Sequence, residues 1–255
     1  MIKSTAVFKV IRKEFLNDDN FVIDLLCPEG EHDFLPGQFV NVSVDHSKTT
    51  FLRRPISVHD FQKSENILSL FIQIVGDGTR ELSKLKIDDS LSLVYPLGNQ
   101  FGYANTTKPL LIGGGCGVAP LLYLARKMSE KNITPDILIG ARSSKNIFLI
   151  EKYAAFGKVF TITQDGSHGE NGLVTQHSIF QNLKNYDKIF VCGPDVMMKA
   201  IAKIARKENV ECEVSLENTM ACGIGACLCC VEDTVNGHVC VCTEGPVFNI
   251  NDLKW

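Results

Sequence analysis

The chain has 255 residues, of which 45% are hydrophobic and 22% are charged, and its formal net charge is −3. This length fits about two domains, at ~100–200 residues per domain. The weak negative charge gives no electrostatic reason to expect a nucleic-acid partner. No apolar run reaches the ~20 residues that span a bilayer, and the first residues lack the apolar core of a signal peptide. The composition therefore predicts a cytoplasmic protein that binds neither nucleic acid nor membrane.

Six short runs in the first part of the chain have the composition of β-strands. They are rich in β-branched and aromatic residues, and Gly, Pro, Asn and Asp separate them. The runs cover residues 3–15, 20–27, 37–44, 53–61, 67–75 and 89–97. This pattern predicts an antiparallel β-barrel domain over residues 1–100, interrupted by one short helix at 79–86.

From Lys108 onward, buried strands alternate with amphipathic helices. The expected strands cover residues 108–115, 136–142, 158–166, 187–194 and 211–217, and the expected helices cover 119–128, 146–156 and 195–206. Such alternation predicts βαβ units and a doubly wound parallel sheet over residues 101–217, after a linker at 99–107. Residues 218–255 are a third, short segment with no room for a core of its own. The predicted fold class is therefore β + α/β.

A glycine-rich turn lies between the first strand and the first helix of the α/β domain. It contains Gly113, Gly114, Gly115 and Gly117. Glycine permits a tight turn and lets a diphosphate approach the N–H groups at the start of the helix. Val118 stands where a strict dinucleotide fingerprint has its third glycine, so tight strand–helix packing is an alternative explanation. A second loop follows another strand, at Cys192, Gly193 and Pro194. Because ligands bind at the carboxyl ends of such strands, the two loops together favour a nucleotide site.

Two arginines precede a proline in the segment FLRRPIS of the barrel domain. One interpretation is that the guanidinium of Arg53 or Arg54 pairs with a phosphate in bidentate fashion, while Ser57 supplies a hydroxyl. The alternative is an edge strand with solvated arginines, since Pro55 favours an edge. The segment IVGDGTREL is similarly open, because its Thr79 is either a helix cap or a second phosphate contact.

The densest signal is a group of cysteines near the C-terminus. Cys222, Cys227 and Cys230 have the spacing C-x4-C-x2-C, and a fourth cysteine follows at Cys240 or Cys242. This is the ligand spacing of plant-type [2Fe–2S] clusters, and the small residues between the first two thiols leave N–H groups free to bind sulfur. A structural zinc site is the first alternative, although zinc sites usually show two short C-x2–4-C pairs. A thioredoxin-like pair fits less well, because the cysteines lie at the end of the chain rather than after a first strand.

Together these features resemble the ferredoxin–NADP reductase-like superfamily, and most closely the electron-transfer subunits of class 1B (NAD-linked) dihydroorotate dehydrogenases. The segments LRRPIS, IGGGCGVAPL, CGPDVM, SLENTMACGIGAC and EGPVF carry the resemblance, which runs the whole chain. It implies an FAD in the barrel, bound by Arg54, Pro55, Ile56, Ser57, Phe71, Ile72, Gln73, Gly78 and Thr79. It implies an NAD against Gly113, Gly114, Gly115, Gly117, Cys192, Gly193 and Pro194. It also implies that Cys222, Cys227, Cys230 and Cys242 bind the cluster, since the fourth ligand of the family precedes a run that matches TEGPVF here.

The chain departs from the family pattern at two positions. Gln73 stands where an arginine is frequent, which puts that flavin contact in doubt, and Cys229 is a surplus thiol. The resemblance implies that a partner subunit oxidises dihydroorotate on its FMN, in pyrimidine biosynthesis. Electrons then pass through the [2Fe–2S] cluster and the FAD of this chain to NAD+. The assembly would be a heterotetramer, and no residue of this chain is assigned to act on dihydroorotate.

Two other functions remain open at this point. The chain could serve a different partner as an NAD(P)H:acceptor reductase subunit that handles ferredoxin or sulfide. It could also be a zinc-bound module without enzymatic activity. The choice of coenzyme is open as well, because Arg142, Ser143, Ser144 and Lys145 follow the second strand where an acidic residue would argue for NAD. These side chains either bind a 2′-phosphate or belong to a solvated loop.

Overall fold

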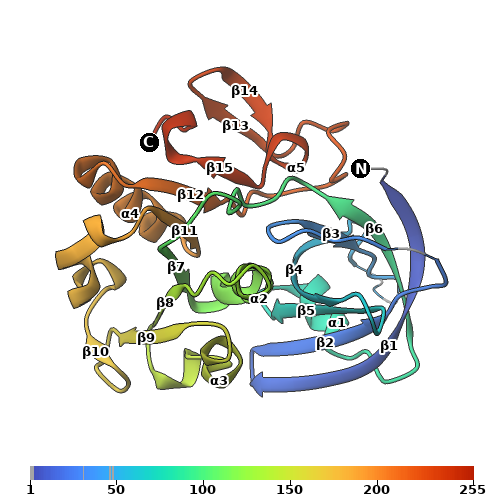
Figure 1. The fold of residues 1–255 in the computed structure, drawn as a ribbon. Helices are drawn as coiled ribbons and strands as arrows, with labels where there is room; N and C mark the ends of the chain where they lie inside the picture. Colours follow the sequence, from blue (N-terminus) through green and yellow to red (C-terminus); the bar gives the residue numbers. More distant parts are fainter. Residues whose placement is uncertain (1–2, 31, 46, 48) are drawn as a thin grey trace. The chain divides into compact units, whose positions relative to one another are not determined.

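The computed structural model describes residues 3–30, 32–45, 47 and 49–255. The chain divides into two compact units (Figure 1). The first contains residues up to 100 together with 218–232 and 238–246, and the second contains 101–217, 233–237 and 247–255. The last segment of the chain is therefore shared between the two units. No helix in the described ranges has both the length and the apolarity to cross a bilayer.

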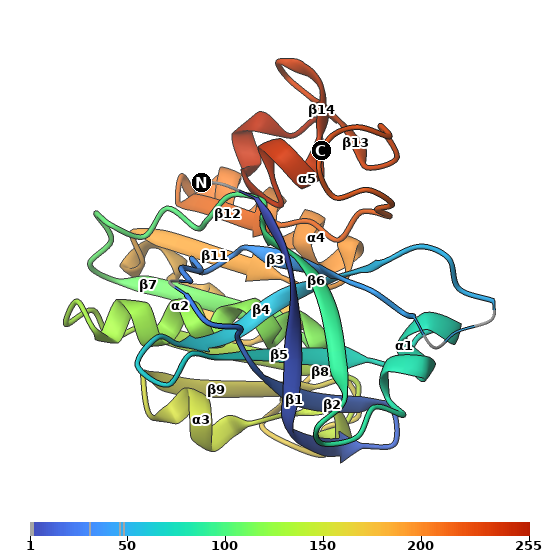
Figure 2. The ribbon, with the colours of Figure 1, turned by 90° about the vertical axis from the view of Figure 1, so that its right-hand side faces the viewer.

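The first unit contains a closed barrel with the strand order β1-β2-β5-β4-β3-β6. Its strands are β1 (Ser4–Asn17), β2 (Asn20–Leu26), β3 (Phe39–Val42), β4 (Arg54–Gln62), β5 (Ile67–Gln73) and β6 (Ser90–Leu97). Antiparallel pairs link all neighbours, and Figure 2 shows β1 and β6 running side by side. The predicted six-stranded antiparallel barrel is confirmed. The expected helix at 79–86 is shorter and earlier, as α1 (Asp77–Leu82).

Alternation of side chains along the strands forms the barrel core. Phe8 and Val10 of β1 are fully buried, while their neighbours Val7 and Lys9 are not. Phe34, Phe61 and Tyr95 add aromatic contacts at 4.8–5.6 Å between ring centroids. Each large apolar side chain buried in this way contributes about 1.5–3 kcal/mol. This core supports the cofactor-binding segments described below.

The second unit contains a seven-stranded sheet in the order β10-β9-β8-β7-β11-β12-β15. Its strands are β7 (Pro109–Gly114), β8 (Asp136–Ala141), β9 (Lys158–Thr163), β10 (Glu170–Asn171), β11 (Lys188–Cys192), β12 (Glu211–Ser215) and β15 (Val247–Asn249). The helices are α2 (Ala119–Ser129), α3 (Ile150–Ala154) and α4 (Asp195–Glu208), with short 3-10 turns η1 (Gly115–Val118), η2 (Ser144–Asn146), η3 (Val174–Gln176), η4 (Ser178–Asn185) and η5 (Ile250–Asp252). The predicted parallel sheet is confirmed.

The chain changes direction in this sheet at β7. The strand after β7, β8, lies on one side of it, and β11 lies on the other, both in parallel. This is the switch point at which ligands of doubly wound sheets bind. β15 joins the far edge antiparallel to β12 and was not expected from the sequence.

The segment after β12 contains a small sheet of β13 (Val231–Thr234) and β14 (Gly237–Cys240), followed by the one-turn helix α5 (Val241–Glu244). α4 holds the end of the chain, because the Arg206 guanidinium donates to the carbonyl groups of Ile250, Leu253 and Trp255. The C-terminal residues are thus packed into the second unit rather than trailing from it.

Candidate cofactor sites

The cysteine segment folds into a loop whose backbone N–H groups point at sulfur. Sγ of Cys222 accepts from the N–H groups of Ile224 at 3.5 Å and Cys227 at 3.4 Å. Sγ of Cys242 accepts from Gly225 at 3.1 Å, and Sγ of Cys230 accepts from Cys242 at 3.4 Å. Such N–H donors stabilise thiolates and tune the potential of a bound cluster. The donor set therefore fits an iron–sulfur cluster.

The same hydrogen bonds affect the ionisation of the first thiol. Burial opposes ionisation of Cys222, but the N–H groups of Ile224 and Cys227 outweigh it and lower its pKa to about 6. The thiolate, which is the form that binds metal, is thus available at neutral pH. No group of three or more His, Cys, Asp or Glu side chains in the described part of the chain converges as ligands of a single metal ion do.

The surroundings of the remaining cysteines favour Cys242 over Cys240 as the fourth ligand. Cys242 is fully buried, its N–H donates to Sγ of Cys230, and its Sγ accepts from the N–H of Gly225. Cys240, by contrast, is half-buried at the start of α5. Cys229 is exposed. No N–H···S bond to Cys240 or Cys229 is present among the described contacts of the loop. The four-ligand set predicted from the sequence stays a prediction, with this geometry in its favour.

The residues predicted to bind FAD lie on two adjacent strands and one helix of the barrel unit. Arg54, Pro55, Ile56 and Ser57 form the start of β4 and are all half-buried, unlike the next residue, Val58. Val58 pairs with Leu70, which precedes Phe71, Ile72 and Gln73 on β5. Phe71 and Ile72 are buried, so we expect any contact that they make with FAD to come from their backbone. Gln73 is half-buried at the end of β5.

Arg54 also contacts the third part of the predicted FAD site. A Cβ atom placed on Gly78 would lie 2.4 Å from Nε of Arg54 and 2.8 Å from its Cζ. The guanidinium therefore packs on the bare backbone of α1, and its Nη1 donates to the carbonyl of Leu52 at 2.8 Å. The guanidinium and the bare backbone at Gly78 together form a surface that fits a diphosphate. Any side chain at position 78 would disturb this surface.

Arg53 has a different role from Arg54. Its Nη1 donates to the carbonyl groups of Ser92 at 2.8 Å and Asn41 at 3.3 Å, and its Nη2 donates to the Ser92 hydroxyl at 3.0 Å. These contacts connect β3 and β6 within the barrel. Arg54 therefore stays the arginine predicted to bind the FAD phosphate, whereas Arg53 is engaged between strands.

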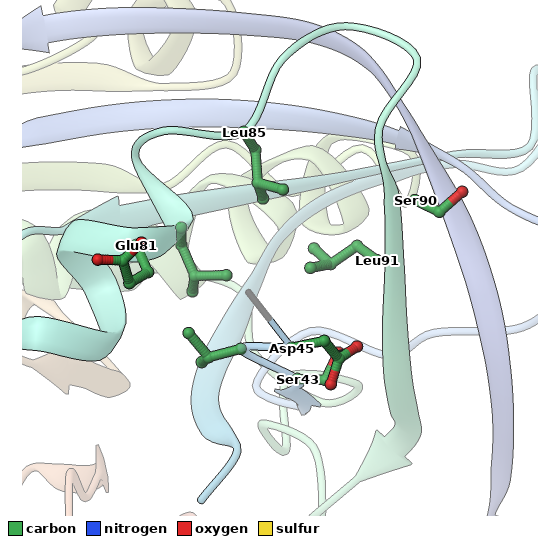
Figure 3. A pocket seen from close by; sticks show the side chains of 8 residues that line it. Ser43, Asp45, Glu81, Leu85, Ser90 and Leu91 are labelled. Carbon is green, nitrogen blue, oxygen red and sulfur yellow. The ribbon is translucent and has the colours of Figure 1, made fainter. Parts of the chain in front are cut away.

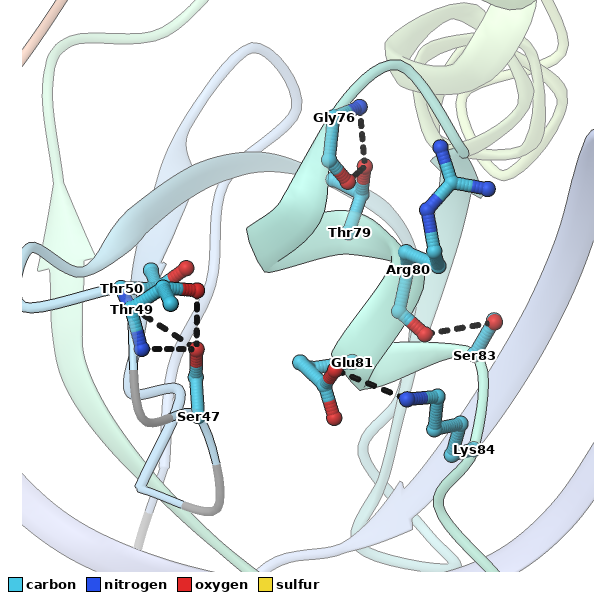
Figure 4. Close-up of polar contacts among 9 residues, drawn as sticks. All are labelled: Ser47, Thr49, Thr50, Gly76, Thr79, Arg80, Glu81, Ser83 and Lys84. Atoms are coloured by element: carbon cyan, nitrogen blue, oxygen red, sulfur yellow. Dashed lines mark hydrogen bonds and ion pairs between the residues drawn. The ribbon is translucent and has the colours of Figure 1, made fainter.

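Thr79 acts as a helix cap (Figure 4). Its hydroxyl accepts from the N–H groups of Val75 at 2.9 Å and Gly76 at 3.2 Å, and donates to the carbonyl of Gly76 at 3.1 Å. A phosphate contact through this hydroxyl would compete with three existing hydrogen bonds. The cap fixes the turn that carries Gly78, which is a positioning role.

A pocket on the barrel unit is lined partly by α1, the helix that carries Gly78 and Thr79 (Figure 3). It is lined by Ser43, Val44, Asp45, Glu81, Leu82, Leu85, Ser90 and Leu91. None of them belongs to the predicted FAD set, and two carboxylates would repel a diphosphate. We therefore do not place FAD in this pocket.

The two glycine loops predicted to bind NAD lie against each other at the switch point. Gly113 of β7 pairs with Cys192 of β11, and a Cβ on Gly117 would lie 2.5 Å from Cα of Gly193. Gly114 also approaches Pro194, with 2.9 Å from its Cβ position to Cδ of the proline. Gly115 has a φ of +57° and open space beside it. This surface of bare backbone fits a nucleotide, as the sequence predicts.

Sequence reasoning missed one acidic residue beside these loops. The Cys192 thiol donates to the Glu217 carboxylate at 3.9 Å, and Glu217 lies just after the end of β12. Burial, with the Glu217 charge second, raises the pKa of Cys116 to about 12 and that of Cys192 well above its ordinary value. Both thiols are therefore neutral. Crowding by protein atoms also raises the pKa of Glu217, but its side chain is exposed, and we expect that shift to be small. The available signal was its position as the last residue of the expected strand 211–217, because ligands bind at the carboxyl ends of such strands.

The loop that bears on the coenzyme uses its serines locally. Ser143 donates to Oδ1 of Asn146 at 3.2 Å, and the N–H of Ser144 donates to the Ser167 hydroxyl at 2.7 Å. These hydrogen bonds occupy groups that a 2′-phosphate would need. A 2′-phosphate would therefore compete with these hydrogen bonds for the two serines.

Comparison with known proteins gives two family matches. Residues 217–254 match the iron-sulfur cluster binding domain of dihydroorotate dehydrogenase B, and residues 111–203 match the oxidoreductase NAD-binding domain. A curated protein of Caldanaerobacter subterraneus subsp. tengcongensis, the dihydroorotate dehydrogenase B (NAD(+)) electron transfer subunit, is 41% identical over 84% of both chains. The protein of the same name from Shouchella clausii is 33% identical over 99% of both chains.

Solved structures show the same architecture. The structure of an NADH-dependent reduced ferredoxin-NADP oxidoreductase aligns with a TM-score of 0.88 and 29% identity, over 99% of this chain and 91% of that one. The ferredoxin reductase of carbazole 1,9a-dioxygenase aligns with a TM-score of 0.72 and 21% identity, over 82% of this chain and 67% of that one. The second likeness concerns the fold alone.

Proposed function

We propose that this chain, which belongs to the family of dihydroorotate dehydrogenase B (NAD+) electron transfer subunits, carries electrons from a dihydroorotate-oxidising partner to NAD+. The partner would hold the FMN at which dihydroorotate is oxidised, in pyrimidine biosynthesis, and two copies of each subunit would form a heterotetramer. The observation that carries the proposal is the N–H···S loop around Cys222, Cys230 and Cys242 in a chain that also has two nucleotide surfaces.

The three groups have complementary chemistry: nicotinamide takes a hydride, an iron–sulfur cluster takes single electrons, and a flavin exchanges both. We assign residues 1–100 to FAD, 101–217 to NAD and 218–255 to the cluster. Arg54 and the bare backbone at Gly78 would bind the FAD diphosphate, with the remaining residues of β4 and β5 beside it. Cys222, Cys227, Cys230 and Cys242 would hold the cluster. Gly113 to Gly117 and Cys192 to Pro194 would hold NAD.

We place the reaction in the cytoplasm. No disulfide links any of the ten cysteines in the described chain. A protein with this many reduced thiols suits a reducing compartment.

Anaerobic purification tests the proposal. The chain is expected to contain FAD and about two iron atoms per chain, and NADH should reduce the flavin. Co-expression with a tagged FMN subunit that oxidises dihydroorotate should give a complex that reduces NAD+. Stoichiometric zinc without iron would overturn the cluster assignment, and an intact cofactor set without complex formation would overturn the partner.

A second candidate function follows from the NADH-dependent reduced ferredoxin-NADP oxidoreductase structure, which aligns over nearly the whole chain. In that case the chain would serve a partner that handles ferredoxin. Pulldown of the native complex distinguishes the two functions, because only one partner oxidises dihydroorotate.

A further inference from the structure

Asn41 connects a strand of the barrel to the cysteine loop. It lies on β3, and its Nδ2 donates to the carbonyl groups of Ala221 at 3.2 Å and Cys222 at 3.3 Å. These two residues lie 180 and 181 positions further along the chain. The second of them is the first cysteine of the loop. A single buried side chain thus binds the peptide groups on either side of the α-carbon of Cys222.

The orientation of the Asn41 amide is fixed by what surrounds it. The residue is 1% exposed, and both of its close neighbours are carbonyl oxygens, which accept and cannot donate. A flipped amide would place Oδ1 against these two oxygens, so only the donating orientation is stable. Oδ1 is then buried without a hydrogen-bond partner in the described structure. A buried acceptor without a partner is destabilising, so what Asn41 contributes here is its donor.

The backbone of Asn41 belongs to the strand beside the FAD segment. In the β3–β4 register, Asn41 is opposite Pro55 and Val42 is opposite Arg54. The Asn41 carbonyl accepts from Arg53 at 3.3 Å. The β3–β6 ladder is irregular between Phe39 and Asn41, a type of bulge that re-aims a side chain. Asn41 therefore has its main chain beside the predicted FAD segment and its side chain on the cluster loop.

The loop fits closely around this side chain. Gly223, directly after Cys222, has a φ of +72°, and a Cβ there would lie 3.0 Å from Nδ2 of Asn41 and 3.1 Å from Cδ1 of Leu97. The loop backbone thus lies directly on the barrel at this point. A displacement of the Asn41 amide would move Cys222 with it.

We propose that Asn41 is a positioning residue that fixes the first cluster ligand, Cys222, to the strand beside the FAD segment. The proposal rests on the proposed function. The geometry of a ligand and its hydrogen bonds set the potential of an iron–sulfur cluster, and its separation from the flavin sets the rate of electron exchange. Asn41 thereby tunes the cluster without contacting iron.

The test compares Asn41→Leu with a matched control, Asn20→Leu. Asn20 is also a 1%-exposed asparagine on a barrel strand with an unpartnered Oδ1, but its Nδ2 donates to Asn17. Each holoprotein is purified anaerobically, and FAD, iron, the EPR spectrum of the reduced cluster and its midpoint potential are measured. We expect changed g values and a shifted cluster potential in N41L, with FAD retained, and a wild-type spectrum in N20L.

A second variant acts from the loop side, so that the result does not depend on an altered barrel. Gly223→Ala introduces a methyl group against the Asn41 amide, whereas Gly237→Ala adds one at a φ of +103° with nothing within 4 Å. We expect G223A to change the cluster spectrum in the same direction as N41L, and G237A to leave it unchanged. If N41L loses both FAD and iron, the cluster spectrum of G223A tests the role of Asn41 instead.

The outcomes separate the two proposals. Wild-type protein without FAD or iron would overturn the proposed function. Wild-type protein with both groups, together with unchanged g values and potential in N41L and G223A, would overturn the role of Asn41 alone.

Discussion

The guanidinium of Arg54 rests on Gly78, at a distance that leaves no room for a side chain: a Cβ there would meet Nε at 2.4 Å. Gly78 is buried in α1, and Arg54 is half-buried at the start of β4. The contact joins β4 to α1, two segments that are not adjacent in the sequence. It defines the surface on which we place the FAD diphosphate.

Substitution of Gly78 by alanine should weaken FAD binding. The methyl group would push the guanidinium off its site, and we expect the Kd for FAD to rise at least about tenfold, or about 1.4 kcal/mol. Titration of apoprotein with FAD, followed by flavin fluorescence, measures the change. Gly76→Ala is the matched control, because nothing lies within 4 Å of its Cβ position. Equal affinities in the two variants would contradict the site.

Substitution of Arg53 should affect folding rather than FAD. Arg53→Met removes three hydrogen bonds that connect β3 and β6. We expect the free energy of unfolding to fall by about 1–3 kcal/mol, because charge-assisted hydrogen bonds that join two strands are lost. Urea denaturation measures the free energy of unfolding. Arg54→Met should show the opposite pattern, with weaker FAD binding and little change in that free energy. A loss of FAD affinity in R53M at full folding would reverse our assignment.

The fourth cluster ligand can be identified by single serine substitutions. Cys242→Ser should reduce iron from about two atoms per chain to nearly none, since serine is a poor cluster ligand. Cys240→Ser and Cys229→Ser should each retain about two. Iron analysis and the visible spectrum of anaerobic protein measure the difference. Retention of iron in C242S with its loss in C240S would show that the ligand is Cys240.

A side chain at Gly117 should obstruct NAD. Its Cβ would lie 2.5–2.6 Å from the backbone of Cys192 and Gly193, so one loop must move. We expect Gly117→Ala to slow flavin reduction by NADH at least about tenfold, at unchanged FAD and iron content. Stopped-flow reduction measures the rate. Cys116→Ala, in the same loop, removes a side chain without a clash and should stay close to wild type.

Stability should depend on pH through His177. Burial lowers the pKa of this imidazole, with the Glu170 charge opposing the shift. The folded state therefore resists protonation that the unfolded chain accepts from about pH 6.5 downward, so stability present above that pH is lost as pH falls. Asn retains an oxygen for the Ile179 N–H that now donates to Nδ1. His177→Asn should flatten the decline in urea midpoint between pH 7 and pH 5, whereas exposed His168→Asn should not.

The cysteine spacing and strand patterns carried most of the fold and cofactor predictions. Spacing is informative because a loop that wraps a cluster needs its thiols at fixed intervals, and alternation is informative because a barrel has an inside and an outside. Both are local properties of the sequence. The six barrel strands and the parallel sheet were predictable for that reason.

The contacts between distant segments were not predictable. Arg53 and Arg54 are adjacent and chemically equal, and only the β3–β4 register decides which one faces β6. Nothing in the sequence around Asn41 distinguishes it from other polar residues in strands. Its role depends on contact with the cysteine loop, which is 180 residues further along the chain. The three-residue strand β15 carries too little pattern to be recognised, and pairing with β12 alone makes it a strand.

β15 also limits how the protein can be simplified. An engineer who wants a cluster-free flavin reductase would be inclined to end the chain after Glu217. That cut would remove the partner of β12 at Glu213, Val214 and Ser215, and the three carbonyl groups that Arg206 binds. The shortened sheet would present an unpaired edge, which invites association between copies. Residues 247–255 are thus part of the nucleotide unit, and the cluster is better removed by changing its thiols than by shortening the chain.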